Sequence, residues 1–311
     1  MPTALVTGAA GFIGSSLSET LLERGYRVRG ADNITTGHRS NLQSLEDRDE
    51  FEFYEVDIRD EPAMNDLAEG VDYVFHQAAV PSVPRSVDDP ITTTDANCTG
   101  TATVLDAARR ANVDTVVVAS SSSVYGSSTG LPKVESMTPN PESPYALSKY
   151  YTEKLAIQFS DLYDIDTVAL RYFNVFGPGQ DPNGEYAAVI PKFIQLMTDG
   201  NCPVIYGDGE QSRDFTFIDN VVEANIQAAE GSATGVAVNI GCGGQVTVNE
   251  LVDHINSILD TEIDPAYDDP RPGDVRHSHA DLELAREEIE YEPKVDFQEG
   301  LERTVRYFEN I

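Results

Sequence analysis

The feature that most constrains the fold of this chain is a glycine-rich turn that directly follows its first apolar run. Residues 3–7 (TALVT) have the β-branched character of a buried strand, and Gly8, Gly11 and Gly14 come next at a spacing of three. Such glycines allow a tight turn, a close approach of the backbone to a pyrophosphate, and close packing of the following helix on the strand. The N–H groups at the start of that helix then face the anion. Strand, turn and helix in this order predict a dinucleotide site, although the G-x-x-G-x-x-G spacing alone is weak evidence.

An acidic residue follows where this kind of site needs one. Asp32 lies 18 residues after Gly14, at the end of a second apolar run. A carboxylate there can accept hydrogen bonds from a ribose and repels a 2′-phosphate, which favours NAD over NADP. Arg39 leaves the alternative open, because a nearby arginine can accommodate that phosphate.

Short apolar runs alternate with longer amphipathic segments over the first part of the chain. The runs lie at 3–7, 26–31, 51–56, 72–76, 115–120 and 166–172. Continuous apolar strands joined by helix-length segments are typical of a parallel sheet with both faces covered. The pattern therefore predicts an α/β fold, a Rossmann-type doubly wound parallel sheet.

The pattern changes after residue 174, where loops rich in Gly, Pro and Asp separate the helical segments. Amphipathic windows remain near 188–199, 219–230, 247–259 and 298–309. We predict a smaller C-terminal substrate-binding lobe packed on the first domain around one cleft. The predicted division places residues 1–174 and 214–242 in the NAD-binding domain and residues 175–213 and 243–311 in the lobe.

The charge of the chain excludes some partners. Lys and Arg number 21 against 53 Asp and Glu, a formal net charge of −32. The electrostatic field of such a negative net charge repels nucleic acid phosphates and anionic lipid surfaces, so we expect no nucleic acid and no membrane partner. Only five of the basic residues are lysine, and the acids are spread along the whole chain. This composition suggests a protein from a high-salt cytoplasm, where salt screens the repulsion between carboxylates.

The three cysteines give no metal or disulfide pattern. Cys98, Cys202 and Cys242 form no C-x-x-C and have no ligand spacing, so we expect no structural metal and no disulfide scaffold. The start MPTALVTG lacks a secretory signal pattern, and no apolar run reaches 18 residues. We therefore expect a cytoplasmic protein.

A tyrosine and a lysine stand one helical turn apart in the segment SPYALSK. Ser143 and Pro144 are typical of an N-cap and a first helical position, which places Tyr145 and Lys149 on one helix face. An ammonium near a phenol favours the phenolate and moves the pKa of the phenol from about 10 toward neutral pH. The pair is therefore a candidate for acid–base catalysis.

A second pair, Tyr150 and Lys154, has the same spacing but points elsewhere. Five residues of helix rotate it by roughly 140° from the first pair, so only one pair can face a cleft. We select Tyr145 because it lies in the first turn of the helix, nearest to the strand ends where doubly wound sheets bind ligands.

Four serines end the fifth apolar run. Residues 120–123 thus lie at a carboxyl edge of the predicted sheet, where hydroxyl groups can bind a substrate oxygen. His76 and the other histidines have no spacing that suggests a metal site or a nucleophile triad, and we assign them structural roles.

Taken together, the motifs resemble the extended short-chain dehydrogenase/reductase family, and within it most closely the NAD-dependent UDP-hexose 4-epimerases. The motifs are GAAGFIG, the DN at 32, the DI at 57, HQAAV at 76, SSSSVYG at 120, SPYALSK at 143 and LRYFNVFGPGQ at 170. RDFTFIDN at 213 and RPGDVRHS at 271 extend the likeness to the C-terminal part.

The resemblance implies roles for particular residues. Tyr145, Lys149 and Ser121 would be catalytic, with Ser122 or Ser123 able to share the work of Ser121. The cofactor would contact Gly8, Gly11, Phe12, Ile13, Gly14, Asp32, Asn33, Asp57, Ile58, Ala78, Ala79, Asn97, Tyr145, Lys149 and Phe173. The nucleotide sugar would contact Ser121, Ser122, Ser123, Tyr145, Asn174, Ala188, Val189, Lys192, Tyr206, Arg213, Arg271, Asp274 and Ser278.

The same resemblance implies a reaction and a set of partners. Tyr145 would remove the proton of the sugar 4-OH while C4 gives a hydride to NAD, and the 4-keto sugar would take the hydride back on its other face. UDP-glucose and UDP-galactose are the expected substrates. Ser278, a small residue near the expected C2 pocket, adds UDP-GlcNAc and UDP-GalNAc. A homodimer built from the helices around 97–111 and 145–163 is also implied.

Three alternatives remain open on sequence grounds. A nucleotide-sugar 4,6-dehydratase would carry an Asp-Glu pair where this chain has Ser122 and Ser123, which lack the acid and base that elimination requires. A UDP-glucuronate decarboxylase is a second alternative. The third, a non-catalytic NAD-sensing module, would not need the tyrosine, the lysine and the serine together.

Overall fold

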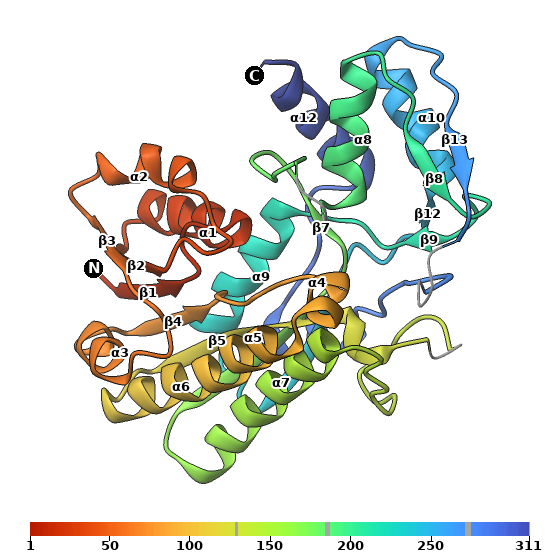
Figure 1. Cartoon of the computed structure of the whole chain (residues 1–311). Helices are drawn as coiled ribbons and strands as arrows, with labels where there is room; N and C mark the ends of the chain where they lie inside the picture. Colours follow the sequence, from red (N-terminus) through yellow and green to blue (C-terminus); the bar gives the residue numbers. More distant parts are fainter. Residues whose placement is uncertain (128–129, 184–186, 271–274, 311) are drawn as a thin grey trace.

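A seven-stranded parallel sheet lies at the centre of the computed structural model, which describes residues 1–127, 130–183, 187–270 and 275–310 (Figure 1). The strands run in the order β11-β6-β5-β4-β1-β2-β3. Their bounds are Thr3–Thr7 (β1), Arg27–Asp32 (β2), Phe51–Glu55 (β3), Tyr73–His76 (β4), Thr115–Ser121 (β5), Asp166–Tyr172 (β6) and Val236–Ile240 (β11). The first six match the predicted apolar runs to within one residue at each end, and the predicted Rossmann-type sheet is confirmed.

The order of the strands reverses beside β1. The chain proceeds from β1 to β2 and β3 on one side and returns to β4 on the other, continuing to β5, β6 and β11. Loops that leave the carboxyl ends of β1 and β4 therefore turn in opposite directions and open a crevice between them. The glycine turn, at Gly8, lies at this point.

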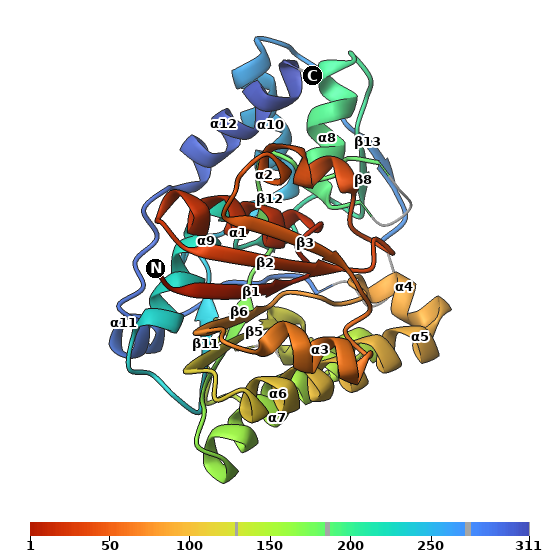
Figure 2. The same cartoon turned by 90° about the vertical axis from the view of Figure 1, so that its left-hand side faces the viewer.

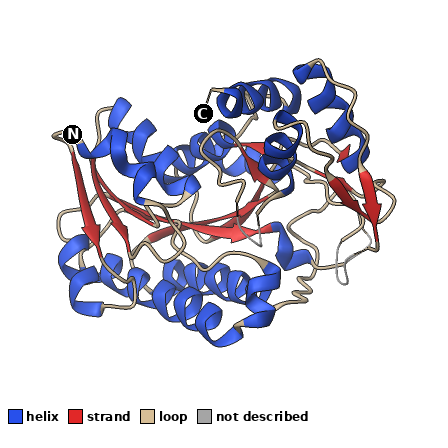
Figure 3. Ribbon diagram, turned by 45° about the horizontal axis from the view of Figure 1, so that its top comes forward, coloured by secondary structure: helices blue, strands red, loops and turns tan. Residues whose placement is uncertain are grey.

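Helices cover both faces of the sheet (Figures 2 and 3). Alternate strand residues face opposite sides, so in β5 Val116 and Val118 join one buried cluster while Val117 and Ala119 join the other. One face is covered by α1 (Phe12–Glu23) and α9 (Ile218–Glu230), and the other by α3 (Glu61–Ala68), α6 (Gly100–Arg110) and α7 (Pro144–Leu162). The shorter helices are α2 (Gln43–Glu46), α4 (Val83–Asp88) and α5 (Pro90–Thr94), and a π-helical turn, Asp95–Thr99, joins α5 to α6.

Three short two-stranded sheets and three helices lie beside this domain. The strand pairs are β7 (Val175–Phe176) with β10 (Thr216–Phe217), β8 (Val204–Tyr206) with β13 (Ala266–Asp268), and β9 (Ser212–Arg213) with β12 (Val246–Thr247). The helices α8 (Val189–Thr198), α10 (Val248–Leu259) and α12 (Phe297–Glu309) pack against one another. Together with α9, they match the four predicted helical windows.

One helix of the predicted lobe contacts the central domain. Helix α11 (Glu283–Ile289), which was expected in the lobe, packs against β11 and α9 of the central domain (Figure 2). The physical reason is its apolar side, because Ala285 and Ile289 belong to the same buried cluster as Val238 and Ile240 of β11.

Within the described ranges, no helix is long and apolar enough to cross a membrane.

Candidate active site

A cavity of about 540 Å³ opens along the carboxyl edge of the sheet. Its walls come from the turn after β1, the ends of β2 to β6 and the first turns of α7. The residues predicted for the site that line it are Gly8, Gly11, Phe12, Ile13, Gly14, Asp32, Asn33, Asp57, Ile58, Ala78, Ala79, Tyr145, Lys149 and Ala188. Residues from distant parts of the sequence therefore meet here because the ends of parallel strands share one edge.

The glycine turn has no room for side chains. Gly8 has a φ of +72°, and a Cβ added to it would lie 2.7 Å from the backbone nitrogen of Ala78. A Cβ at Gly14 would overlap the carbonyl oxygen of Gly8, so α1 can pack this closely on β1 only with glycine there. Gly11 caps α1 without a side-chain hydrogen bond, which leaves the first N–H groups of the helix available to an anion. This geometry fits a bound pyrophosphate.

Asp32 is held in a fixed orientation at the end of β2. Its Oδ2 accepts from Ala10 N at 3.0 Å and its Oδ1 from Ile34 N at 2.7 Å. Burial raises the pKa of the Asp32 carboxyl, and these two backbone hydrogen bonds lower it. Arg39, the residue that could have favoured a 2′-phosphate, binds instead to Glu46 at 3.1 Å and Glu55 at 3.2 Å.

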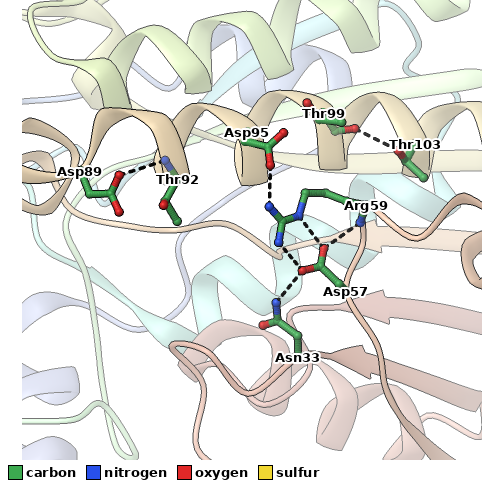
Figure 4. A network of polar contacts seen from close by, with 8 residues as sticks. All are labelled: Asn33, Asp57, Arg59, Asp89, Thr92, Asp95, Thr99 and Thr103. Carbon is green, nitrogen blue, oxygen red and sulfur yellow. Dashed lines mark hydrogen bonds and ion pairs between the residues drawn. The ribbon is translucent and has the colours of Figure 1, made fainter.

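Asp57 and Asn33 form a polar cluster at the same end of the cavity, together with an arginine that the sequence reasoning missed (Figure 4). Asn33 Nδ2 donates to Asp57 Oδ2 at 3.1 Å, and Arg59 Nη2 and Nε donate to the Asp57 carboxylate at 2.6 and 2.9 Å. The Arg59 guanidinium holds the pKa of Asp57 well below its usual range. Two further lining residues that were missed, Gln77 and Tyr172, follow or end strands β4 and β6. The rule that ligands bind at strand ends could have found them.

Tyr145 and Lys149 both line the cavity from the start of α7. Ser143 caps this helix by accepting from Ala146 N at 3.1 Å, with Pro144 at the first helical position, as predicted. The Ser121 hydroxyl lies beside the Tyr145 phenol and lowers its pKa, and Lys149 Nζ donates to the carbonyl oxygen of Ala119 at 2.8 Å. Strand β5 and helix α7 thus bring a phenol, a hydroxyl and an amine to one place.

Burial has the largest effect on the pKa values of Tyr145 and Lys149, whereas the helical spacing predicts an attraction between the two side chains. Burial raises the pKa of Tyr145, and the hydrogen bond from Ser121 lowers it. Burial also lowers the pKa of Lys149 to about 8, because its ammonium lies in a water-poor environment. The ammonium is directed to the Ala119 carbonyl, so in the protein alone desolvation outweighs the attraction that the helical spacing predicts.

The competing pair takes no part in the cavity. Tyr150 packs against the apolar core, and Lys154 Nζ lies 5.7 Å from the centre of its ring. Neither residue lines the cavity that Tyr145 and Lys149 share. The geometry therefore supports the selection of Tyr145.

The serines at the end of β5 have different partners. Ser120 Oγ donates to the buried Glu153 carboxylate at 3.1 Å. Ser121 Oγ accepts from Ser123 Oγ at 2.9 Å and from Ser123 N at 3.2 Å. Ser121 is the serine that contacts Tyr145, and Ser123 orients it.

Several predicted site residues lie outside the cavity walls. Asn97 binds Val80 N at 2.7 Å and Ser148 Oγ at 2.9 Å, so it supports the wall from behind. Phe173 is fully buried in the core and does not line the cavity. The described residues that do not line the cavity are Ser121, Ser122, Ser123, Asn174, Val189, Lys192, Tyr206, Arg213 and Ser278. Arg271 and Asp274 lie outside the described residues.

His76 has a structural environment. It is fully buried, with Nδ1 2.7 Å from Thr7 Oγ1 and Nε2 3.0 Å from Thr101 Oγ1. Burial lowers its pKa to about 3, so the ring is neutral. In the described part of the chain, no three His, Cys, Asp or Glu side chains come together as a metal site.

Comparisons with known proteins agree with this geometry. Residues 4–241 match the family described as the NAD dependent epimerase/dehydratase family. The UDP-glucose 4-epimerase of Mycolicibacterium smegmatis is 41% identical over 308 residues, 98% of each chain. The UDP-N-acetylglucosamine 4-epimerase of Methanobrevibacter ruminantium, solved with UDP-N-acetylmuramic acid, is 40% identical with a TM-score of 0.95, over 99% of this chain and 98% of that one. The Thermus thermophilus UDP-glucose 4-epimerase, solved with NAD, is 34% identical with a TM-score of 0.88, over 98% of each chain.

Proposed function

The chain belongs to the NAD dependent epimerase/dehydratase family, and from this premise we propose that it inverts C4 of a UDP-hexose with NAD as cofactor. The observation that carries the proposal is that Tyr145 and Lys149 line the cavity that the glycine turn begins, with Ser121 beside Tyr145. The three groups are those that proton transfer at a sugar hydroxyl requires. The full-length likeness to 4-epimerases from several organisms supports the same reaction.

The residues of the cavity fit NAD. The glycine turn and the start of α1 would hold the pyrophosphate, Asp32 and Asn33 the adenosine ribose, and Asp57 with Ile58 the adenine. Lys149 would bind the second ribose, next to Tyr145. Bound NAD supplies the hydride acceptor and donor for C4, while the chain supplies orientation and acid–base groups.

Tyr145 is the proton carrier of the proposed reaction. In the first half Tyr145 would act as the phenolate, which the positive charge of bound NAD favours. It would take the proton of the 4-OH as C4 loses a hydride, which gives a 4-keto sugar. Ser121, in contact with Tyr145, hydrogen-bonds the same sugar oxygen. The keto sugar then rotates about its diphosphate linkage, and Tyr145 returns the proton when C4 regains the hydride on the other face. The result is inversion at C4 without net oxidation.

Product analysis tests the proposal and separates it from its alternatives. The protein is incubated with UDP-glucose, UDP-GlcNAc, UDP-glucuronate and the corresponding dTDP-sugars, and products are identified by NMR. We expect only C4-inverted UDP-sugars. Loss of water to a 4-keto-6-deoxy sugar would instead indicate a dehydratase, and CO₂ from UDP-glucuronate a decarboxylase. Binding of NAD without any turnover would indicate the sensing module.

The cofactor preference depends on Asp32. Asp32→Ala removes the ribose acceptor and the repulsion toward a 2′-phosphate, so we expect NAD affinity to fall about 10- to 100-fold, the range of a hydrogen bond to a charged group. The difference in affinity between NAD and NADP should become smaller. Calorimetric titration with both cofactors measures the effect, and Asp49→Ala, which removes one exposed carboxylate, is the control. If the unmodified protein already prefers NADP, the assignment of NAD is wrong.

The range of substrates depends on Ser278 in our proposal. This half-buried residue donates its N–H to Ser212 O at 3.0 Å, beside Arg213, which we propose pairs with the substrate diphosphate. Ser278→Tyr should therefore abolish interconversion of UDP-GlcNAc and UDP-GalNAc by overlap with the acetamido group, and spare UDP-glucose and UDP-galactose. Ser232→Tyr, at an exposed position, is the matched control. Unchanged turnover of the N-acetylated pair in Ser278→Tyr would restrict the proposal to plain hexoses.

We propose that the protein is a homodimer. Helices α5 and α7 lie side by side, and Ile91, Leu147 and Tyr151 on them are 81%, 58% and 41% exposed. Exposed apolar side chains on neighbouring helices are typical of an interface. Light scattering should give twice the 33.9 kDa mass of the chain, whereas a mass of one chain would contradict the proposal.

A further inference from the structure

Two walls of different origin meet at one end of the cavity. One wall is the loop after β3, from which Val56, Asp57, Ile58 and Arg59 line the cavity. The opposite wall comes from α5 and the π-helical turn that follows it, which contribute Thr92 and Ala96. Single π-helical turns are rare and occur frequently at functional sites.

Arg59 connects these two walls. On its own wall it binds the Asp57 carboxylate with Nη2 at 2.6 Å and Nε at 2.9 Å. Its Nη1 binds the Asp95 carboxylate of the opposite wall at 2.5 Å. Figure 4 shows the guanidinium between the two carboxylates, with Asn33 on the far side of Asp57. One cation therefore holds two anions that belong to different sides of the cavity.

A second contact joins the loop after β3 to α6, the helix that continues from the opposite wall. Ile58 is buried against Gly100, where a Cβ would lie only 2.7 Å from Ile58 Cγ1. The loop after β3 and the start of α6 therefore touch directly, and the ion pairs lie on the solvent side of this contact, since Arg59 is 38% exposed.

We propose that the bridge Asp57–Arg59–Asp95 closes the end of the cavity over the bound cofactor and sets the rate at which NAD leaves. The inference rests on the proposed placement of the adenosine half of NAD between these walls. To leave from this end, the cofactor must separate the loop from the helix, and that separation breaks the contacts of Arg59 with Asp95. Arg59 is thus a positioning residue for the cofactor site and takes no part in proton transfer.

Slow release of the cofactor favours completion of the proposed epimerase reaction. The hydride that leaves C4 must return to the same sugar. If the reduced cofactor dissociates after the oxidation at C4 and before the reduction, the keto sugar cannot be converted to product. A bridge made of ion pairs can hold the walls together between the two halves and still open on a slower timescale, because exposed ion pairs are individually weak.

The test is the dissociation rate of the reduced cofactor. The whole protein is loaded with NADH, mixed rapidly with excess NAD, and followed by NADH fluorescence. We expect Arg59→Gln and Asp95→Asn each to raise the dissociation rate constant about three- to tenfold, the range that one or two exposed ion pairs account for. The double variant should release NADH no faster than Arg59→Gln alone, because both changes break one bridge.

Arg110→Gln is the matched control. Arg110 of α6 pairs with Asp106 of its own helix at 2.7 Å and with Glu61, in the segment after β3, at 3.5 Å, but it does not line the cavity. We expect its release rate to equal that of the unmodified protein. Equal release rates in Arg59→Gln, Asp95→Asn and the unmodified protein would overturn the proposal. A faster rate in Arg59→Gln alone would also overturn it, because Arg59 would then act on the ligand without the bridge.

Asp32→Ala in the same assay separates this inference from the placement of NAD. Faster release in Asp32→Ala with unchanged release in the Arg59 and Asp95 variants would leave the placement standing and overturn the bridge. Unchanged release in Asp32→Ala would show that NAD does not lie in the proposed position, and the bridge would fall with it.

Discussion

Tyr145→Phe is expected to lose about 10²- to 10⁴-fold in turnover, the contribution typical of a positioned acid–base group, while NAD binding and the fold remain. The substitution removes one hydroxyl at the start of α7 and hardly changes the volume of the side chain. Tyr145 lines the cavity, with Ser121 beside it, so the substitution removes the proposed proton carrier from the site. The measurement is the rate of C4 inversion by NMR, together with the melting temperature with and without NAD.

Tyr150→Phe is the matched control for this prediction. Tyr150 lies on the same helix with the same spacing to a lysine, but it packs against the core and does not line the cavity. Loss of the Tyr150 hydroxyl should leave turnover within about twofold of that of the unmodified protein, as expected of a group outside the site. Equal losses in the two variants would mean that the phenol of Tyr145 has no special role.

Glu153→Gln is expected to lower the free energy of unfolding by about 3–5 kcal/mol, because it leaves a buried guanidinium without its counter-ion. The Glu153 and Arg171 side chains are 0% and 4% exposed, and Arg171 Nη2 and Nε bind the carboxylate at 2.7 and 2.8 Å. Ser120 donates to the same carboxylate, so the pair also joins helix α7 to the strand end that carries Ser121. Denaturant unfolding with an unchanged m value measures the loss.

The control for Glu153→Gln is a pair on the surface. Glu292→Gln breaks the ion pair with Arg286, whose side chains are 64% and 49% exposed, and should cost less than about 1 kcal/mol. Replacing both Glu153 and Arg171 by methionine should recover part of the stability, because no buried charge is then left unpaired. A loss for Glu153→Gln as small as that for Glu292→Gln would contradict the assignment of a buried, paired charge.

The features that the sequence determined by itself are local or periodic. The first six strands and the helical windows follow from apolar spacing, and the start of α7 follows from Ser143 and Pro144, because a helix cap depends on residues close in sequence. The choice of Tyr145 over Tyr150 follows from the fixed rotation of a helix. Asp32 could be placed because the number of residues between the glycine turn and the end of the next strand varies little in this fold.

Only the tertiary structure decided the features that depend on distant partners and on burial. Arg59 meets Asp95, 36 residues away, and Lys149 is directed to Ala119 instead of lowering the pKa of Tyr145. Helix α11 packs against β11 and α9. Its apolar face predicts that one side of the helix is covered, but not which element covers it. The physical reason is common to all three: spacing along the chain sets which side of an element a residue occupies, whereas its partner, its desolvation and hence its pKa are set by the packing of elements remote in sequence.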